Sequence, residues 1–362
     1  MSVALSGLFV GILFGFALQR GRFCMNSAIR DTILLKDTTL LKSVIMAILV
    51  AMVGFALMAS AGLIKISPSG FFWGAHLVGG ILFGIGMVLA GGCASGITYR
   101  IGEGVVSALS AAIGLTIAGT LTMIGFLTPI KDYLQKSTQI WVTAANGAEP
   151  VKINPTLANI FGMDHTLVAI GLAVIIAIIW IVIAIKNREE PEKKTKVSLF
   201  TAIFSKGWVW WVTGIAIGLV NVLAFYMSTL AKRSYPLGIT SGWAGIAKVL
   251  IGYEQVTDGV ATAYKLGWGD YLIIGIILGT FIAALIAREF KIRWPGWGTI
   301  GQTFAGGLLM GFGAITSGGC NVGHILSGLP QLGIGSIVGG ISIILGAWFM
   351  AYMLFVRPQN AK

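Results

Sequence analysis

The stretch GGILFGIGMVLAGGCASG, residues 79–96, decides how this chain is organised, because the chain contains it twice. Residues 306–323 read GGLLMGFGAITSGGCNVG, and a shift of 227 positions aligns the two copies. The matched residues are Gly79, Gly80, Gly84, Gly86, Gly91, Gly92, Cys93 and Gly96 in the first copy, and Gly306, Gly307, Gly311, Gly313, Gly318, Gly319, Cys320 and Gly323 in the second. Two of only three cysteines fall on matched positions, so we interpret the repeat as a duplication. Each copy places one thiol where an apolar helix gives way to glycine-rich backbone.

The composition is that of a membrane protein. Of the 362 residues, 56% are apolar and only 10% are charged, whereas a soluble domain carries about 25% charged residues. A helix that crosses the hydrocarbon core needs about 20 apolar residues. Nine stretches fit, some of them short: 3–18, 42–63, 71–90, 105–127, 166–185, 208–231, 271–287, 301–317 and 333–355. The sequence therefore predicts an all-α polytopic membrane protein with about nine transmembrane helices, the first of them retained rather than cleaved as a signal peptide.

The net charge of +12 is explained by topology rather than by a nucleic-acid partner, for which the chain has no motif. Membrane proteins gather Lys and Arg in their cytoplasmic segments. If the N-terminus lies outside and the C-terminus in the cytoplasm, the inside segments hold 17 Lys and Arg and the outside segments hold 8. The charge distribution therefore favours an outside N-terminus and a cytoplasmic C-terminus.

The chain divides into two membrane units. Gly7 and Gly11 match Gly214 and Gly218 at an offset of 207, and the charged stretch 186–196 separates the copies. We expect residues 1–127 to form the first membrane repeat and residues 208–362 the second. Residues 128–207 would hold an outside loop without evident chemistry, a connecting helix and a charged cytoplasmic linker.

Five crossings lie between equivalent points, so the two repeats would be inverted, with broken or re-entrant helices carrying the GGC motifs. This arrangement is typical of secondary transporters. Close helix packing is an alternative reason for the glycines, but it does not explain the paired cysteines.

The candidate site consists of Cys24, Cys93, Cys320, Gly91, Gly92, Gly318 and Gly319. The four glycines would provide unusual backbone conformation or close approach, whereas Gly54 is interpreted as an ordinary position within a span. Backbone that leaves a helix frees N–H groups, and helix N-termini favour anions. Thiols add a soft surface with weak S–H donors. Together these features suggest a sulfur-containing oxyanion as the ligand.

Other roles for the cysteines remain open. A buried cysteine can be a small apolar side chain, and a structural disulfide is compatible with the sequence. A soft-metal site with His324 is conceivable, but the thiols are far apart in sequence and His324 has no counterpart in the first copy, so we expect no metal. No CxxC pair and no nucleotide-binding GxxxxGK[ST] motif is present.

Three motifs carry a family resemblance across nearly the whole chain. They are GRFCMNSAIRD (residues 21–31), AGGCASGITYRIGEG (90–104) and SGGCNVGHILSG (317–328). In this order they resemble the cysteine motifs of the YeeE/YedE family of bacterial inner-membrane sulfur transporters. The resemblance implies uptake of thiosulfate through a constriction between the two halves, lined by Cys24, Cys93 and Cys320. It also implies a lipid environment, no catalytic residue, no cofactor, and a separate TusA-like sulfurtransferase as a cytoplasmic partner.

Two alternative functions stay open. The transported compound could be another sulfur or selenium compound, or the chain could be a membrane thiol oxidoreductase, which the lack of CxxC disfavours. Among secondary candidates, Arg100 and Glu103 are compatible with an ion pair at the membrane edge or with substrate contact. Further polar residues could line the route: Gln19, Asn26, Ser95, Thr98, Asn321 and His324. We expect all three thiols to lie along one route.

Overall fold

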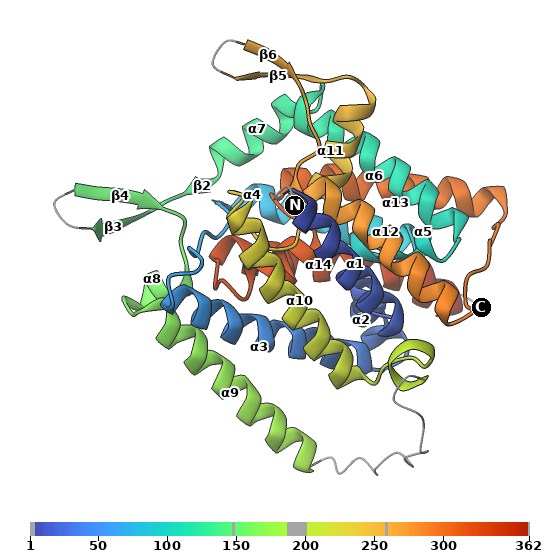
Figure 1. Ribbon diagram of the computed structural model, residues 1–362, viewed down its shortest axis with the longest axis horizontal. Helices are drawn as coiled ribbons and strands as arrows, with labels where there is room; N and C mark the ends of the chain where they lie inside the picture. The colour runs from blue at the N-terminus through green and yellow to red at the C-terminus, as the bar shows by residue number, and fades with distance from the viewer. Residues whose placement is uncertain (1–3, 147–148, 187–200, 258–259, 361–362) are drawn as a thin grey trace.

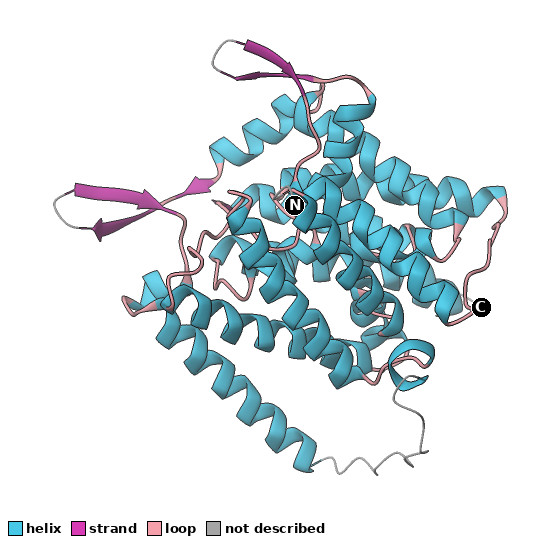
Figure 2. Ribbon diagram, viewed as in Figure 1, coloured by secondary structure: helices cyan, strands magenta, loops and turns pink. Residues whose placement is uncertain are grey.

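The computed structural model describes residues 4–146, 149–186, 201–257 and 260–360, and these form a bundle of helices with short hairpins at its margin (Figures 1 and 2). The long helices of this part of the chain are α1 (Leu5–Arg20), α3 (Thr39–Ser60), α4 (Trp73–Leu89), α6 (Val106–Ile124), α9 (His165–Lys186), α10 (Trp210–Leu230), α12 (Trp268–Ile286), α13 (Trp297–Thr316) and α14 (Ile334–Ala351). The shorter ones are α2 (Met25–Leu34), α5 (Ala94–Gly102), α7 (Thr128–Ser137), α8 (Leu157–Phe161), α11 (Thr240–Leu250) and α15 (Arg357–Asn360), with π-helical segments η1 (Thr201–Ser205), η2 (Val322–Gly328) and η3 (Tyr352–Val356).

Among the described residues, the strands form three antiparallel pairs. β1 (Phe71–Phe72) pairs with β2 (Gln139–Ile140), β3 (Val142–Asn146) with β4 (Glu149–Ile153), and β5 (Glu254–Thr257) with β6 (Val260–Ala263). The β3–β4 and β5–β6 hairpins project away from the bundle (Figure 2). The protein is therefore an all-α polytopic membrane protein, as predicted.

The long helices lie close to the nine predicted spans. Within the described residues, eight stretches are long and apolar enough to cross a membrane, and two of them, Leu5–Leu34 and Trp73–Gly102, continue past a break into a short helix. α13 is not among the eight, because Gln302 and its many glycines lower its hydropathy. α9 has the highest mean hydropathy, 3.1, and only 11% of its apolar window is buried, so it is a lipid-facing helix at the edge of the bundle (Figure 1).

The helices of the two predicted units pack reciprocally. α1 packs along α12 while α10 packs along α3, and α4 packs along α14 while α13 packs along α6. The offsets of 207 and 227 convert each of these contacts into its counterpart. α4 also contacts α13, and α1 contacts α10. A two-fold axis that relates the units would pair the helices in this reciprocal way. The boundaries 1–127, 128–207 and 208–362 stay a prediction, and most of the charged linker lies outside the described residues.

Glycines bring the long helices into backbone contact. A Cβ on Gly11 would lie 2.8 Å from the Cα of Gly275, and a Cβ on Gly15 would clash with the carbonyl oxygen of Ile276. A Cβ on Gly84 would clash in the same way with the carbonyl oxygen of Ile343. Because lipid removes the hydrophobic drive for helix association, such close van der Waals packing holds a membrane bundle together.

We expect Gly15→Leu to destabilise the bundle, because the new side chain has to displace the backbone of α12. Overpacking of this kind costs about 1–3 kcal/mol or more, which should appear as a lower thermal midpoint and less monodisperse protein in detergent. The matched control is Gly171→Leu in α9, since a Cβ there would meet nothing within 4 Å. Equal thermal midpoints for the two variants would contradict the packing argument.

Candidate functional site

The two GGC motifs form the same break in two helices. α4 ends at Leu89 and α13 at Thr316. Beyond each end, the N–H of the second glycine returns to the helix, from Gly92 to Met87 O (3.1 Å) and from Gly319 to Ala314 O (2.9 Å). The first glycine of each motif is left-handed, with φ of 68° at Gly91 and 76° at Gly318. Each cysteine then stands at the start of the next helical segment.

The second glycine of each motif is required for close approach rather than for its φ. A Cβ on Gly92 would lie 3.2 Å from Cγ2 of Ile97, and a Cβ on Gly319 would lie 3.1 Å from Nε2 of His324. The interpretation of Gly54 as an ordinary position is wrong. A Cβ on Gly54 would clash with the side chain of Val222, because α3 and α10 cross closely there.

Cys24 and Cys93 lie together in the interior. Their Sγ atoms are 3.9 Å apart, and both side chains are buried. Each residue is the N-cap of a short helix, Cys24 of α2 and Cys93 of α5. The Sγ of Cys93 accepts the N–H of Gly96 (3.3 Å). A Cβ on Gly96 would lie 2.8 Å from the Sγ of Cys24 and 3.2 Å from that of Cys93, so the lack of a side chain at Gly96 allows the two thiols to meet.

A cavity of about 470 Å³, which we name the inner cavity after the side that the charge distribution predicts for it, opens beside this thiol pair. Its lining consists of Arg22, Cys24, Ser27, Tyr99, Arg100, Glu103, Val105, Glu289 and Arg293. Arg100 donates to the carbonyl oxygen of Gly91 (2.6 Å) and so caps the first GGC break. Glu103 accepts from Gln19 (3.3 Å), and its ion pair with Arg100 stays a prediction, because the charge of Arg100 acts on Glu103 while its guanidinium donates to the break.

The two carboxyl groups of the inner cavity differ in their electrostatics. Burial raises the pKa of Glu103, and this outweighs the Gln19 hydrogen bond and the charges of Arg100 and Arg293. Burial also acts to raise the pKa of Glu289, but the Gln19 hydrogen bond and the charges of Arg20 and Arg22 hold it below its usual value. Glu289 accepts from Arg20 at 2.6 Å. Glu289 is paired with Arg20 and Arg22, and the arginines that line the cavity outnumber its two glutamates.

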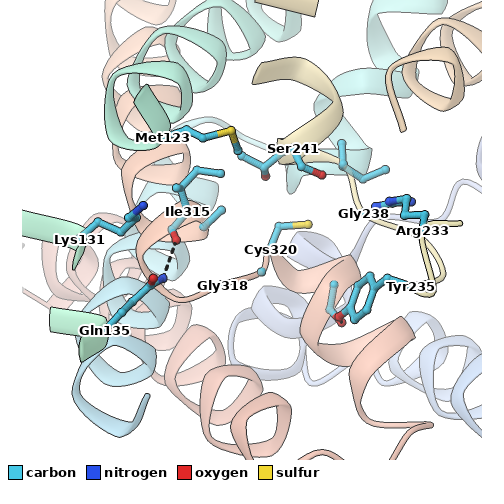
Figure 3. A pocket seen from close by; sticks show the side chains of 15 residues that line it. Met123, Lys131, Gln135, Arg233, Tyr235, Gly238, Ser241, Ile315, Gly318 and Cys320 are labelled. Carbon is cyan, nitrogen blue, oxygen red and sulfur yellow. Dashed lines mark hydrogen bonds between the residues drawn. The ribbon is translucent and has the colours of Figure 1, made fainter. Parts of the chain in front are cut away.

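A cavity of about 320 Å³, which we name the outer cavity after the side that the charge distribution predicts for it, contains Cys320 (Figure 3). Its lining consists of Met123, Lys131, Gln135, Arg233, Tyr235, Gly238, Ile239, Thr240, Ser241, Ala314, Ile315, Gly318, Gly319, Cys320 and Gly323, with two cations and no carboxylate. The thiol of Cys320 lies between Lys131 and Gln135 on one side and Arg233 and Tyr235 on the other. The ammonium group of Lys131 is paired with Asp132 (2.9 Å), so the cavity combines a soft sulfur atom with Arg233 and a paired lysine.

Fixed contacts orient the polar side chains of the outer cavity. Gln135 donates to the carbonyl oxygens of Thr316 (2.9 Å) and Ile315 (3.2 Å), and so caps the end of α13. Arg233 donates to Pro236 O (2.9 Å), and its guanidinium lies 5.2 Å from the ring centre of Trp268. Burial lowers the pKa of Arg233, opposed by nearby Tyr235 and Asp270, but an arginine remains a cation at neutral pH.

Two hydrogen bonds connect residues that neighbour the two cavities in sequence or in space but do not line them. Asn321, which follows Cys320, donates from Nδ2 to the Sδ of Met25, which follows Cys24 (3.1 Å). The indole of Trp243 in α11 donates to the Oγ1 of Thr98 in α5 (2.9 Å). The structure therefore brings Cys24 and Cys93 together directly and places Cys320 in the neighbouring cavity. His324 is buried behind Gly319 rather than among the residues that line either cavity.

Comparison with known proteins identifies the family of this chain. Residues 20–349 match the model of a family described as sulphur transport. The chain belongs to this sulphur transport family. The resemblance to the YeeE/YedE sulfur transporters is thereby confirmed.

Two similar proteins cover nearly the whole chain, and a third covers part of it. A protein of Spirochaeta thermophila named thiosulfate transporter TsuA is 38% identical over 97% of this chain and 99% of its own length. A protein of Escherichia coli with the same name is 33% identical over 99% of this chain and 97% of its own length. The probable transporter YedE of Salmonella typhimurium is 37% identical over 22% of this chain and 20% of its own length.

Sequence reasoning missed several residues of this family member's cavities. Lys131 and Gln135 come from the loop 128–165, which we expected to hold no evident chemistry, and Arg233 and Tyr235 come from the segment after α10. The sequence does contain a pattern that places Lys131 and Gln135 together. Lys131 and Gln135 are four residues apart behind Pro129, which is favoured in the first turn of a helix, so they share one face.

We expect Gly91→Val to impair both stability and transport, whereas Gly91→Asn should be tolerated. A left-handed conformation costs a non-glycine residue about 1–2 kcal/mol, and asparagine adopts it more readily than valine. A Cβ at Gly91 would meet nothing within 4 Å, so the difference between the variants isolates the backbone effect. Thermal midpoints and uptake measured side by side check this. Equal loss in both variants would contradict the proposed role of the left-handed turn.

Proposed function

We propose that this protein imports thiosulfate across the inner membrane of a bacterium. The observation that carries the proposal is the pair of cavities, each of which combines a cysteine with basic side chains: Cys320 with Lys131 and Arg233, and Cys24 with Arg22, Arg100 and Arg293. Full-length similarity to two proteins named thiosulfate transporters supports the same substrate.

The chemistry of thiosulfate suits these cavities. The ion is a dianion with a soft terminal sulfur atom and three hard oxygen atoms. In the outer cavity the oxygens would accept from Lys131 and Arg233, while the terminal sulfur faces the thiol of Cys320. Cys93 and Cys24 would then contact the ion in turn before it enters the inner cavity. Conduction needs such successive weak sites, because a single tight site would retain the ion.

The charge distribution supports an outside N-terminus and a cytoplasmic C-terminus. In this orientation the Cys320 cavity, beside α7 and the segment after α10, faces the exterior, and the Cys24 cavity faces the cytoplasm. No bond in the substrate needs to break during passage, so the proposal includes no enzymatic step. A separate TusA-like sulfurtransferase would receive the ion beside Arg22 and Arg293.

A second candidate, thiol redox exchange, is favoured by one observation. The Sγ atoms of Cys24 and Cys93 lie 3.9 Å apart, close enough to form a disulfide after a small movement. Thiol trapping during turnover separates the two functions. Transport predicts that both thiols stay reduced, whereas an oxidoreductase requires an oxidised Cys24–Cys93 pair in each cycle.

We expect Cys93→Ala to abolish uptake of labelled thiosulfate into proteoliposomes, and Cys24→Ala and Cys320→Ala to reduce it. Each change removes a sulfur atom along the proposed route but only a small side chain from the packing, so the folded protein should persist. Cys93→Ser keeps a donor without the soft sulfur and should also transport poorly. Near-normal uptake by a well-folded Cys93→Ala protein would refute the cysteine route. Competition by unlabelled sulfate, sulfite and selenite distinguishes thiosulfate from other oxyanions.

A further inference from the structure

Two imidazole rings lie in contact beside the outer cavity, outside the route of cysteines. His76 in α4 and His324 in η2 are fully buried, and their ring centres are 5.2 Å apart. The N–H of His324 donates to the carbonyl oxygen of Cys320 (2.8 Å), and its ring packs against Gly319. The histidine pair is therefore coupled mechanically to the segment that positions Cys320.

Glycines of α14 make the space for both rings. A Cβ on Gly335 would lie 2.8 Å from Nε2 of His76, and a Cβ on Gly339 would lie 2.9 Å from Nε2 of His324. At the offset of 227 residues, neither histidine and neither glycine is repeated, and Thr303, Ile97, Ala108 and Ala112 stand at the equivalent positions. The histidine pair is thus a feature of the outer cavity alone.

Hydrogen bonds assign the tautomer of each ring. Nδ1 of His76 lies 3.2 Å from Phe72 N but only 2.6 Å from Phe72 O, so we assign its proton to the shorter contact with the carbonyl oxygen. The Ser317 hydroxyl donates to Gly319 O (2.8 Å) and so accepts from Nε2 of His324 (3.4 Å).

Each ring is left with one nitrogen that carries a lone pair, Nε2 in His76 and Nδ1 in His324. Both of these atoms are buried without a hydrogen-bond partner in the described part of the chain. The histidine pair therefore offers two buried ring nitrogens that can accept a proton.

The surroundings of the pair carry no negative charge in the described structure. β1 contributes the rings of Phe71 and Phe72, and α14 contributes glycines. The nearby titratable groups are Cys320 and Tyr235, whose hydroxyl donates to Gly323 O (2.8 Å). Lys131 and Arg233 lie among the residues of the outer cavity. A buried positive charge needs an opposite charge close by, and an anion in the outer cavity would provide it.

We propose that His76 and His324 take up one proton from the outer side when the anion binds beside Cys320. This inference rests on the proposed function and assigns a proton site to it. The dianion favours the protonated pair, and by linkage the proton favours binding of the dianion to the same extent. One of the two negative charges is offset where the ion leaves water, so acid outside the membrane promotes uptake.

Isothermal titration of the purified protein with sodium thiosulfate tests the proposal directly. Titrations in buffers of different ionisation enthalpy give the number of protons taken up per anion bound. We expect about one proton for the unmodified protein at the alkaline end of the neutral range. In this pH range, the affinity for thiosulfate should fall by up to tenfold per pH unit as the pH rises, because one proton is linked to binding. His76→Gln and His324→Gln should still bind thiosulfate, with no proton uptake and a flat pH profile.

The third histidine of the chain provides the matched control. His165 stands at the start of α9 and lines a different cavity, with Lys65 and Trp141, and His165→Gln should take up the proton as the unmodified protein does. If the unmodified protein binds thiosulfate without taking up a proton, this inference is overturned and the proposed function stays intact. Undiminished proton uptake by His76→Gln would have the same consequence. Absence of thiosulfate binding would overturn both. If His324→Gln fails to fold, His76→Gln and the unmodified protein decide the outcome.

Discussion

The backbone of a membrane protein can leave a helix at membrane depth only where its freed polar groups find partners inside the protein. Both GGC breaks meet this condition, and the two cavities depend on it. The N–H of Gly92 returns to Met87 and that of Gly319 returns to Ala314. Because the backbone is satisfied internally, each break can present a cysteine instead of an exposed peptide group.

The two breaks share their backbone but differ in the side chains that complete them. Arg100, from the helix that follows the first break, binds Gly91 O and lines the inner cavity. Gln135, from α7 in the connecting region, binds the last carbonyls of α13 and lines the outer cavity. The repeated scaffold therefore carries a different polar group at each end. Two breaks with the same backbone therefore stand beside cavities that differ in their chemistry.

The breaks and the long helices could be predicted from sequence, because glycine pairs and apolar length are local signals. The meeting of Cys24 with Cys93 could not, since Cys24 has no counterpart in the second unit and its position depends on how α2 enters the bundle. Uniformly apolar helices carry little periodic information about which face meets a neighbour. For this reason the sequence alone does not reveal the close approach of Gly54 to Val222 or the contact of Asn321 with Met25.

The peripheral helix α9 contributes no side chain to the inner or the outer cavity in the described structure, and it packs mainly on α3. In the proposed topology, α9 matters because it sets whether the number of membrane crossings between the two units is even or odd. Four spans in each unit would return the chain to the side from which it started, and a tandem copy would then repeat the first in parallel. One additional crossing makes the count odd and turns the second copy upside down. A helix remote from every thiol would thus determine that the two copies face opposite sides of the membrane.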